Sequence, residues 1–400
     1  MACRQLHPDS PWLLALLAAL VALGPLSIDM YLPAMPTIMR AFDTDIGHMH
    51  LTLSSYLTGF ALFHLACGPL ADRYGRKPIL FGGTLLFVAA CVGCSLSDSV
   101  EEMLFFRFLQ GIGACVGPTL ARAVARDVFG PTGAARALSL IAMLMALAPA
   151  IAPTLGSILL SVLPWPSVFV FLGAYGAVMI VLIHLFLPES LPQVQSLHPR
   201  IILRNYGELL ADPFFLTVTM TSGLVYAGLI VYLASSSFIY IDMLGVPLQY
   251  FGLIFLGSVV GYMVGSALSA RLSRQHDSER IMRYGVVMAV TASCLLLLAS
   301  YLWPASVLAL MLPMMLYSVA MGLVLPHSMA IALRPFAHIA GTASALLGFI
   351  QMSLSAAASA LTGAFLTTSP QPMVWILLAI ASVSLLLGLR AHRLYERTKL

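Results

Sequence analysis

The sequence predicts an all-α integral membrane protein with twelve transmembrane helices. Of its 400 residues, 60% are hydrophobic and only 9% are charged, and the mean hydropathy is +0.95. A soluble fold of this length cannot bury so much apolar surface, so lipid must be the solvent for most of the chain. At about 20 residues per spanning helix, with short connections, the length accommodates roughly twelve spans.

The order of apolar runs and polar breaks predicts each span. The first half holds six, at residues 12–37, 49–71, 79–98, 102–125, 136–161 and 166–187. The second half holds six more, at residues 213–238, 248–270, 281–301, 304–332, 339–365 and 371–391. We therefore expect an N-terminal six-helix bundle (1–187), a cytoplasmic linker over the longest polar stretch (188–212) and a C-terminal six-helix bundle (213–400).

The basic residues predict the orientation. With a cytoplasmic N-terminus, eighteen of the twenty Lys and Arg residues lie on the cytoplasmic side, because only Arg40 lies outside and only Arg107 lies within a span. The positive-inside rule then places both termini in the cytoplasm. The basic residues are scattered between apolar runs rather than gathered on one module, so we expect no nucleic-acid partner. The apolar run after Arg4 is too long for a signal-peptide core and is expected to remain as the first span.

Sequence motifs argue against an enzyme or receptor. No H-E-x-x-H, Ser-His-Asp or G-x-x-x-x-G-K pattern stands in a plausible context, and no soluble catalytic or sensory domain is present. Cys91 and Cys94 form a C-x-x-C inside an apolar run without a nearby His or acid, which favours packing over a metal site or a disulfide. We expect no cofactor and no metal. Two six-helix halves are instead the plan of carriers that bind a small molecule near the bilayer midplane.

One acidic residue is a candidate coupling site. Among sixteen acids, Asp29 alone lies well inside a span. A low dielectric favours the neutral carboxyl and a nearby arginine favours the carboxylate, so its protonation can change with its surroundings. The alternative is an acid near the outer mouth that caps a helix or pairs with Arg40. Tyr31 follows two residues later, and Tyr56 lies in the outer half of the second span; both are candidate pocket residues.

A buried arginine is the second candidate. Arg107 lies in the fourth span, and Gln110 follows one helical turn later on a similar face. An arginine at a helix centre costs about 2.5–3.5 kcal/mol on insertion scales, so its retention calls for a partner or a watery cavity. The alternative is an arginine that snorkels to the outer surface. Gln110 and, in the eleventh span, Gln351 are further pocket candidates. The alternative is that each only packs, since a single polar residue in a span more often serves packing.

The connection after the second span carries the first family signature. It reads Gly68-Pro-Leu-Ala-Asp-Arg-Tyr-Gly-Arg-Lys-Pro78 and resembles the loop motif of the major facilitator superfamily, G-x-L-a-D-r-x-G-r-k-p. Arg107-Phe-Leu-Gln-Gly-Ile-Gly113 likewise resembles its fourth-span motif R-x-x-q-G-x-g. The resemblance implies the major facilitator fold with a cytoplasmic latch made by Gly68, Asp72, Arg73, Gly75 and Arg76, with Asp127 as a partner.

Two further segments resemble one branch of that superfamily. Ala148-Pro-Ala-Ile-Ala-Pro-Thr-Leu-Gly-Ser157 is similar to the antiporter motif g-x-x-x-G-P-x-x-G-g, with Ala152, Pro153 and Gly156 at its centre. Leu26-Ser-Ile-Asp-Met-Tyr-Leu-Pro-Ala-Met-Pro36 resembles the first span of drug:proton antiporters of the bicyclomycin and chloramphenicol resistance (Bcr/CflA) subfamily.

This resemblance implies a function. A proton-coupled multidrug efflux carrier of the bacterial inner membrane is expected, exporting chloramphenicol- or bicyclomycin-type compounds by alternating access. The proton gradient would be its energy source, and the monomer its functional form. Asp29 and Arg107 would couple protons to substrate. The alternative is a major facilitator carrier that exports or takes up a small metabolite, such as an amino acid or a polyamine.

Overall fold

The chain folds as helices throughout its described residues. The computed structural model describes residues 11–191 and 199–398, and within these ranges it contains no β-strand. Ten helical stretches are long and apolar enough to cross a membrane. One of them, Val307–Phe365, contains two helices, and the shorter apolar helix Ala148–Val162 adds another span. The twelve spans predicted from the sequence are therefore confirmed.

The first six spans are built from seven elements. The first span is interrupted and consists of α1 (Pro11–Asp29), a 3-10 turn η1 (Leu32–Ala34) and α2 (Met35–Ala41). It is followed by α3 (Ile46–Tyr74), α4 (Arg76–Ser95), α5 (Val100–Val162) and α6 (Pro166–Phe186). Helix α5 includes two spans because the chain turns at Gly130, whose φ of 63° is in the left-handed region that glycine adopts without strain.

The second half begins with a short helix, α7 (Pro199–Ala211), inside the stretch predicted as a linker. The spans that follow are α8 (Pro213–Ser237) with its π-helical extension η2 (Phe238–Met243), α9 (Leu248–Leu272), α10 (Ser278–Leu302), α11 (Val307–Leu333), α12 (Ala340–Phe365) and α13 (Gln371–Thr398). A 3-10 segment, η3 (Arg334–Ile339), joins α11 to α12. The Asp212 carboxylate caps α8 by accepting the Phe215 N–H at 2.6 Å.

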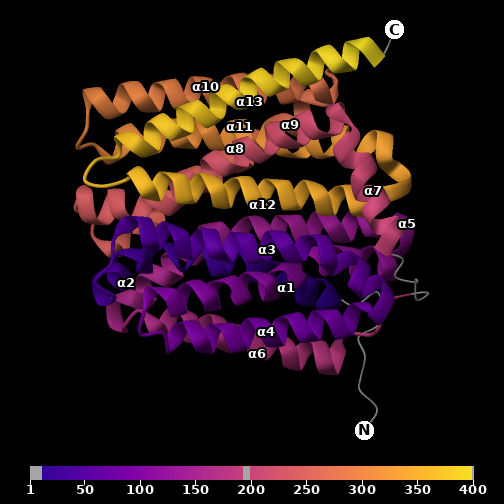
Figure 1. The fold of residues 1–400 in the computed structure, drawn as a ribbon, viewed down its shortest axis with the longest axis horizontal. Helices are drawn as coiled ribbons and strands as arrows, with labels where there is room; N and C mark the ends of the chain where they lie inside the picture. The colour runs from indigo at the N-terminus through magenta and orange to yellow at the C-terminus, as the bar shows by residue number, and fades with distance from the viewer. Residues whose placement is uncertain (1–10, 192–198, 399–400) are drawn as a thin grey trace. The chain divides into compact units, whose positions relative to one another are not determined.

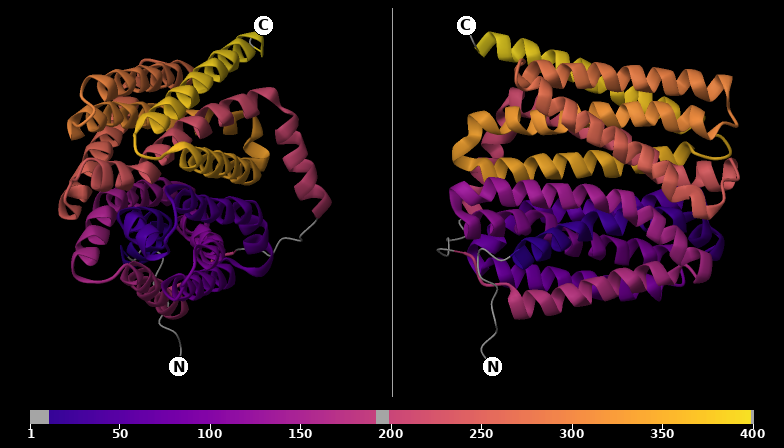
Figure 2. Two further views of the ribbon diagram at one scale, coloured as in Figure 1. Left: turned by 60° about the vertical axis from the view of Figure 1, so that its left-hand side comes forward. Right: turned by 180° about the vertical axis from the view of Figure 1, so that it is seen from behind.

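Contacts divide the chain into two compact units, Met1–Thr44 with Ser55–His198, and Asp45–Ser54 with Pro199–Leu400. In the first unit, α1 and α4 pack on α5, and α6 packs on α4 (Figure 1). In the second unit, α12 and α13 pack on α8, α10 packs on α11 and α13, and α9 packs on α11 (Figures 1 and 2). Helix α3 is continuous, but its first nine residues group with the second unit.

Candidate substrate and proton site

Asp29 lies at a break in the first span. A helix continuing through this point would need the N–H of residue 33 to bond the carbonyl of Asp29, and Pro33 has no N–H. The side chain is only 5% exposed. Within the described residues, its carboxyl has no hydrogen bond or ion pair, so the alternative pairing with Arg40 is not formed. The structure thus places this acid inside the span, at a helix end, without a compensating charge.

Arg107 is fully buried in α5, and two aromatic rings enclose its guanidinium. The guanidinium carbon lies 4.3 Å from the centre of the Tyr31 ring and 4.4 Å from that of the Tyr56 ring. A desolvated cation–π contact contributes about 2 kcal/mol. Two such contacts are comparable to the insertion cost of about 2.5–3.5 kcal/mol. The snorkelling alternative is wrong, because the charge is held inside by aromatic faces.

Hydrogen bonds fix the plane of this guanidinium. Arg107 Nη1 donates to the carbonyl of Ser27 at 3.2 Å and to Gln110 Oε1 at 2.6 Å. Gln110 Nε2 in turn donates to the Cys91 Sγ of α4 at 3.1 Å. Sequence reasoning assigned Cys91 to packing alone, and no pattern in the sequence indicates that it orients Gln110.

These contacts gather on the segment that carries Asp29. Ser27 precedes Asp29 by two residues and Tyr31 follows it by two, and both contact Arg107. On the far side of the guanidinium, the Tyr56 hydroxyl donates to the carbonyl of Gly24 at 3.2 Å. The structure therefore brings together four of the predicted site residues, Tyr31, Tyr56, Arg107 and Gln110, around the break in the first span.

Part of the Arg107 guanidinium has no partner. Its Nε and Nη2 atoms are buried and make no hydrogen bond within the described part of the chain. A buried donor left unpaired costs about 1–3 kcal/mol, and more when it is charged. Such a group in a native fold calls for a specific reason. An oxygen that reached these two nitrogens would therefore be bound favourably.

Glycines allow α3 and α5 to approach closely enough for these contacts. A Cβ at Gly111 would overlap the carbonyl oxygen of Tyr56, and a Cβ at Gly59 would overlap that of Phe108. Small residues at such crossings let backbones touch. The position of the Tyr56 ring over Arg107 thus depends on Gly111, which belongs to the fourth-span motif.

The predicted antiporter motif packs against the same break. Ala152 and Pro153 are buried. A Cβ at Gly156 would lie 2.7 Å from the carbonyl oxygen of Met30, the residue after Asp29. The small residues of this motif therefore bring the second part of α5 onto the Asp29 segment.

The turn between α3 and α4 holds a cluster of charges. Arg76 Nη1 lies 2.7 Å from Asp72, and Arg76 Nε lies 3.1 Å from Asp127 of α5. The Arg76 side chain is only 12% exposed, and that of Asp127 19%. The pairing of Asp127 with this turn, which the family resemblance implied, is present. Arg73 is exposed, and a Cβ at Gly68 would meet no atom within 4 Å.

Glu189 completes this turn and was not among the predicted residues. Its carboxylate accepts the N–H groups of Arg76 at 2.9 Å and Lys77 at 3.1 Å, the first two residues of α4. An acid at a helix N-terminus satisfies free donors and complements the helix dipole. Gly75, with φ 101°, makes the turn in a conformation that favours glycine.

The second unit has polar side chains of its own. Gln351 is half-buried on α12, where its backbone approaches Gly223 of α8. Glu279, in the first turn of α10, pairs with Arg334 at the end of α11 at 2.9 Å. The Tyr232 and Tyr240 hydroxyls are 3.0 Å apart.

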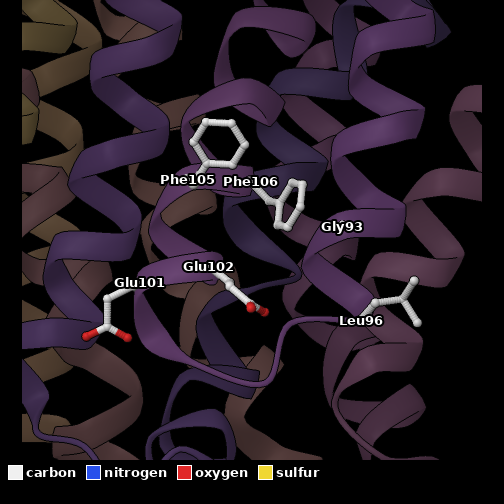
Figure 3. A pocket seen from close by; sticks show the side chains of 6 residues that line it. All are labelled: Gly93, Leu96, Glu101, Glu102, Phe105 and Phe106. Carbon is white, nitrogen blue, oxygen red and sulfur yellow. The ribbon is translucent and has the colours of Figure 1, made fainter.

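A surface depression of about 560 Å³ lies where α4 ends and α5 begins (Figure 3). It is lined by Gly93, Leu96, Glu101, Glu102, Phe105 and Phe106, none of which is a predicted site residue. Glu102 accepts the Asp98 N–H at 3.1 Å, and the Ser99 hydroxyl accepts the Glu102 N–H at 3.3 Å. The Ser99 bond is an N-cap of α5, and the Glu102 carboxylate accepts the N–H of the residue before that cap, so the local helix start accounts for this acid.

Comparison with known proteins decides the family. A sequence profile described as the Major Facilitator Superfamily matches residues 17–360. The chain belongs to the major facilitator superfamily. Members of this superfamily are carriers rather than enzymes, in agreement with the prediction from the sequence.

Two bacterial relatives within the superfamily cover nearly the whole chain. A transporter of Bacillus subtilis (strain 168) described as the uncharacterized MFS-type transporter YdgK is 31% identical over 388 residues, 96% of each chain. A protein of Haemophilus influenzae described as a bicyclomycin resistance protein homolog is 26% identical over 376 residues, 92% of this chain and 93% of that one. The second agrees with the resemblance drawn from the first span.

The major facilitator fold is also seen in solved structures. The crystal structure of a D-xylose–proton symporter superposes with a TM-score of 0.75 over 95% of this chain and 97% of that one, at 15% identity. A symporter thus has the same fold. The direction of transport must therefore be argued from the site and not from the architecture.

Proposed function

We propose that this chain is a proton-coupled exporter of drug-like molecules, working by drug:proton antiport of the Bcr/CflA type. One observation carries the proposal: Asp29 is a buried acid without a partner among the described residues, at a helix break whose neighbouring residues Ser27 and Tyr31 contact Arg107. Broken helices and intramembrane acids mark ion and substrate pathways in carriers. The antiporter motif packed on Met30 supports antiport over symport.

The chemistry is mutual exclusion at one carboxyl group. In the state open to the outside, Asp29 takes a proton and its affinity for substrate falls, so the drug leaves. In the state open to the cytoplasm, drug and proton compete for the same carboxylate, and the proton is released. Because each occupant favours a different state, the proton gradient drives export.

Arg107 positions the charges in this scheme. The Tyr31 and Tyr56 rings hold the guanidinium in a fixed plane, so its unpaired Nε and Nη2 edge keeps one direction. The N–H groups of that edge can donate to the ionised Asp29 carboxylate or to an oxygen of the substrate in another state of the cycle. We place Tyr31, Tyr56 and Gln110 in the substrate site on this ground, and Gln351 of α12 is a separate pocket candidate from the sequence.

Alternating access requires a device with two arrangements. We assign this role to the cluster of Asp72, Arg76 and Asp127, which would face the cytoplasm with both termini in a bacterial inner membrane. Bicyclomycin- and chloramphenicol-type compounds are the proposed substrates, and the name of the Haemophilus influenzae relative supports this class. The monomer would be the working unit, with the proton gradient as its only energy source.

The test is proton movement in proteoliposomes that carry a proton gradient. Phenicols, bicyclomycin and organic cations are added to wild type and to Asp29→Asn, and the internal pH is followed. Proton flux opposite to a drug, lost in the variant, supports antiport through Asp29. A response to amino acids or polyamines and to none of these drugs would move the function to metabolite transport.

A further inference from the structure

His50 is a buried, ionisable residue that the proposed function does not use. It lies one turn inside α3, in the segment Asp45–Ser54 that groups with the second unit, and it is 0% exposed. Its ring stacks on Phe238 of η2, with centres 6.1 Å apart and an angle of 24° between the planes. A Cβ at Gly363 of α12 would overlap the Cβ of His50, so this glycine makes room for the side chain.

The hydrogen bonding of His50 suits only the neutral ring. Nδ1 lies 3.0 Å from the carbonyl oxygen of Ser359. Because a carbonyl only accepts, Nδ1 carries the proton and donates. Nε2 is buried and has no partner among the residues that the structure describes. In the neutral ring, Nε2 carries a lone pair and needs no acceptor. In the protonated ring, Nε2 becomes a charged N–H donor without an acceptor, and burial strongly disfavours such a group.

Among the described residues of α3, α8, η2 and α12, no acidic side chain pairs with the His50 ring. Helix α12 has no ionisable side chain between residues 340 and 365, and tyrosines are the only ones on α8. On η2, Tyr240 bonds to Tyr232, and Asp242 is exposed. Just before α3, Asp45 accepts the His48 N–H at 2.9 Å, which lowers the pKa of that carboxyl, and it also contacts the His48 ring at 2.9 Å.

We propose that His50 is a second proton site and that its protonation releases the start of α3 from α12 and η2. The inference rests on the proposed function, in which this end of α3 faces the acidic exterior. At the exterior, protonation of His50 would open the outer end of the carrier at the same low pH at which Asp29 takes up its proton. The device would couple the external pH to the state from which substrate leaves.

The test uses the accessibility of one introduced thiol and needs neither substrate nor gradient. Ser359→Cys keeps the backbone carbonyl that accepts from His50 and puts a thiol in place of the buried Ser359 hydroxyl, which lies 3.4 Å from Nδ1. The rate of maleimide labelling is measured for this variant, and the background labelling of the native cysteines in the parent protein is subtracted. The corrected rate is divided by that of a reference variant, Asp98→Cys, in the exposed α4–α5 connection. This reference removes the intrinsic pH dependence of the thiol reaction.

On acidification from about pH 8 to about pH 5.5, across the ordinary titration range of histidine, relative labelling of Ser359→Cys should rise about tenfold. His50→Gln, which keeps an N–H donor and cannot take the proton, should label slowly at both pH values. His50→Lys should label fast at both. His48→Gln is the matched control, because His48 is exposed two residues away, and it should keep the wild-type profile.

Three results would overturn the proposal: labelling of the wild type that does not respond to pH, a full response retained in His50→Gln, or a response lost in Asp29→Asn. The last would assign the opening to Asp29. If proton-driven export fails in proteoliposomes but labelling follows His50, only the proposed function falls.

Discussion

The carbonyl oxygen of Tyr56 lies directly against Gly111, so α3 and α5 touch backbone to backbone where the Tyr56 ring covers Arg107. The packing of two helices and the geometry of the site are therefore one feature. Any side chain at residue 111 must move Tyr56 away from the guanidinium.

Gly111→Ala should lower both stability and transport. The added methyl group overlaps backbone, which cannot yield as a flexible side chain does, and overpacking of this kind costs about 1–3 kcal/mol. We expect a lower melting temperature in detergent and slower drug efflux. Gly82→Ala in α4 is the matched control, because its Cβ meets no atom within 4 Å; that variant should be neutral or slightly stabilised. Equal behaviour of the two variants would contradict the assignment.

The planar guanidinium of Arg107 should matter more for transport than its positive charge alone. Arg107→Lys keeps the charge, but its shorter side chain lacks the planar guanidinium that contacts the Tyr31 and Tyr56 rings while Nη1 bonds Ser27 and Gln110. Losing one or two hydrogen bonds to a charged group, at about 1.5–3 kcal/mol each, predicts a decrease in the initial efflux rate of at least about tenfold. Tyr56→Phe should be milder than Tyr56→Leu, because only Phe keeps the aromatic face. Full activity of Arg107→Lys at normal expression would disprove this role.

The charge cluster at the α3–α4 turn should affect turnover rather than binding. Asp72→Ala and Asp127→Asn each remove one partner of Arg76 and should slow efflux while leaving the dissociation constant for drug within about twofold, since neither residue belongs to the proposed pocket. Arg126→Ala, an exposed neighbour of Asp127, serves as control. Unchanged turnover in both acid variants would remove the latch from the mechanism.

The ion pair of the second unit should respond unequally to loss of its two members. The Glu279 side chain is 9% exposed, whereas that of Arg334 is 55% exposed. Arg334→Gln strands a buried carboxylate, and Glu279→Gln leaves an arginine that water can solvate. The melting temperature should therefore fall more in Arg334→Gln than in Glu279→Gln. The reverse order would show that the pair does not stabilise this unit as described.

Sequence reasoning located the spans because hydropathy is a property of each segment by itself. Asp29 and Arg107 were identified for the same reason, since a charge inside an apolar run is visible without knowing its neighbours. The break at Asp29 was also encoded locally, by Pro33. The roles of Asp29 and Arg107 remain predictions that the experiments above test.

Contacts between helices could not be read in the same way. Cys91 meets Gln110, Glu189 meets the start of α4, and Glu279 meets Arg334 because each helix has a particular rotation about its axis. That rotation is set by packing over many residues. Helix α7 was likewise not predicted, because it lies in the longest polar stretch and its one fully buried leucine, Leu209, is a weak signal of packing.

The most direct test of the central claim is to count protons released when drug binds to the purified protein in weakly buffered detergent with a pH-sensitive dye. If substrate and proton exclude one another at Asp29, the wild type should release protons near neutral pH, and Asp29→Asn should bind drug without release. Equal proton release by Asp29→Asn would contradict the account and assign the coupling to another residue.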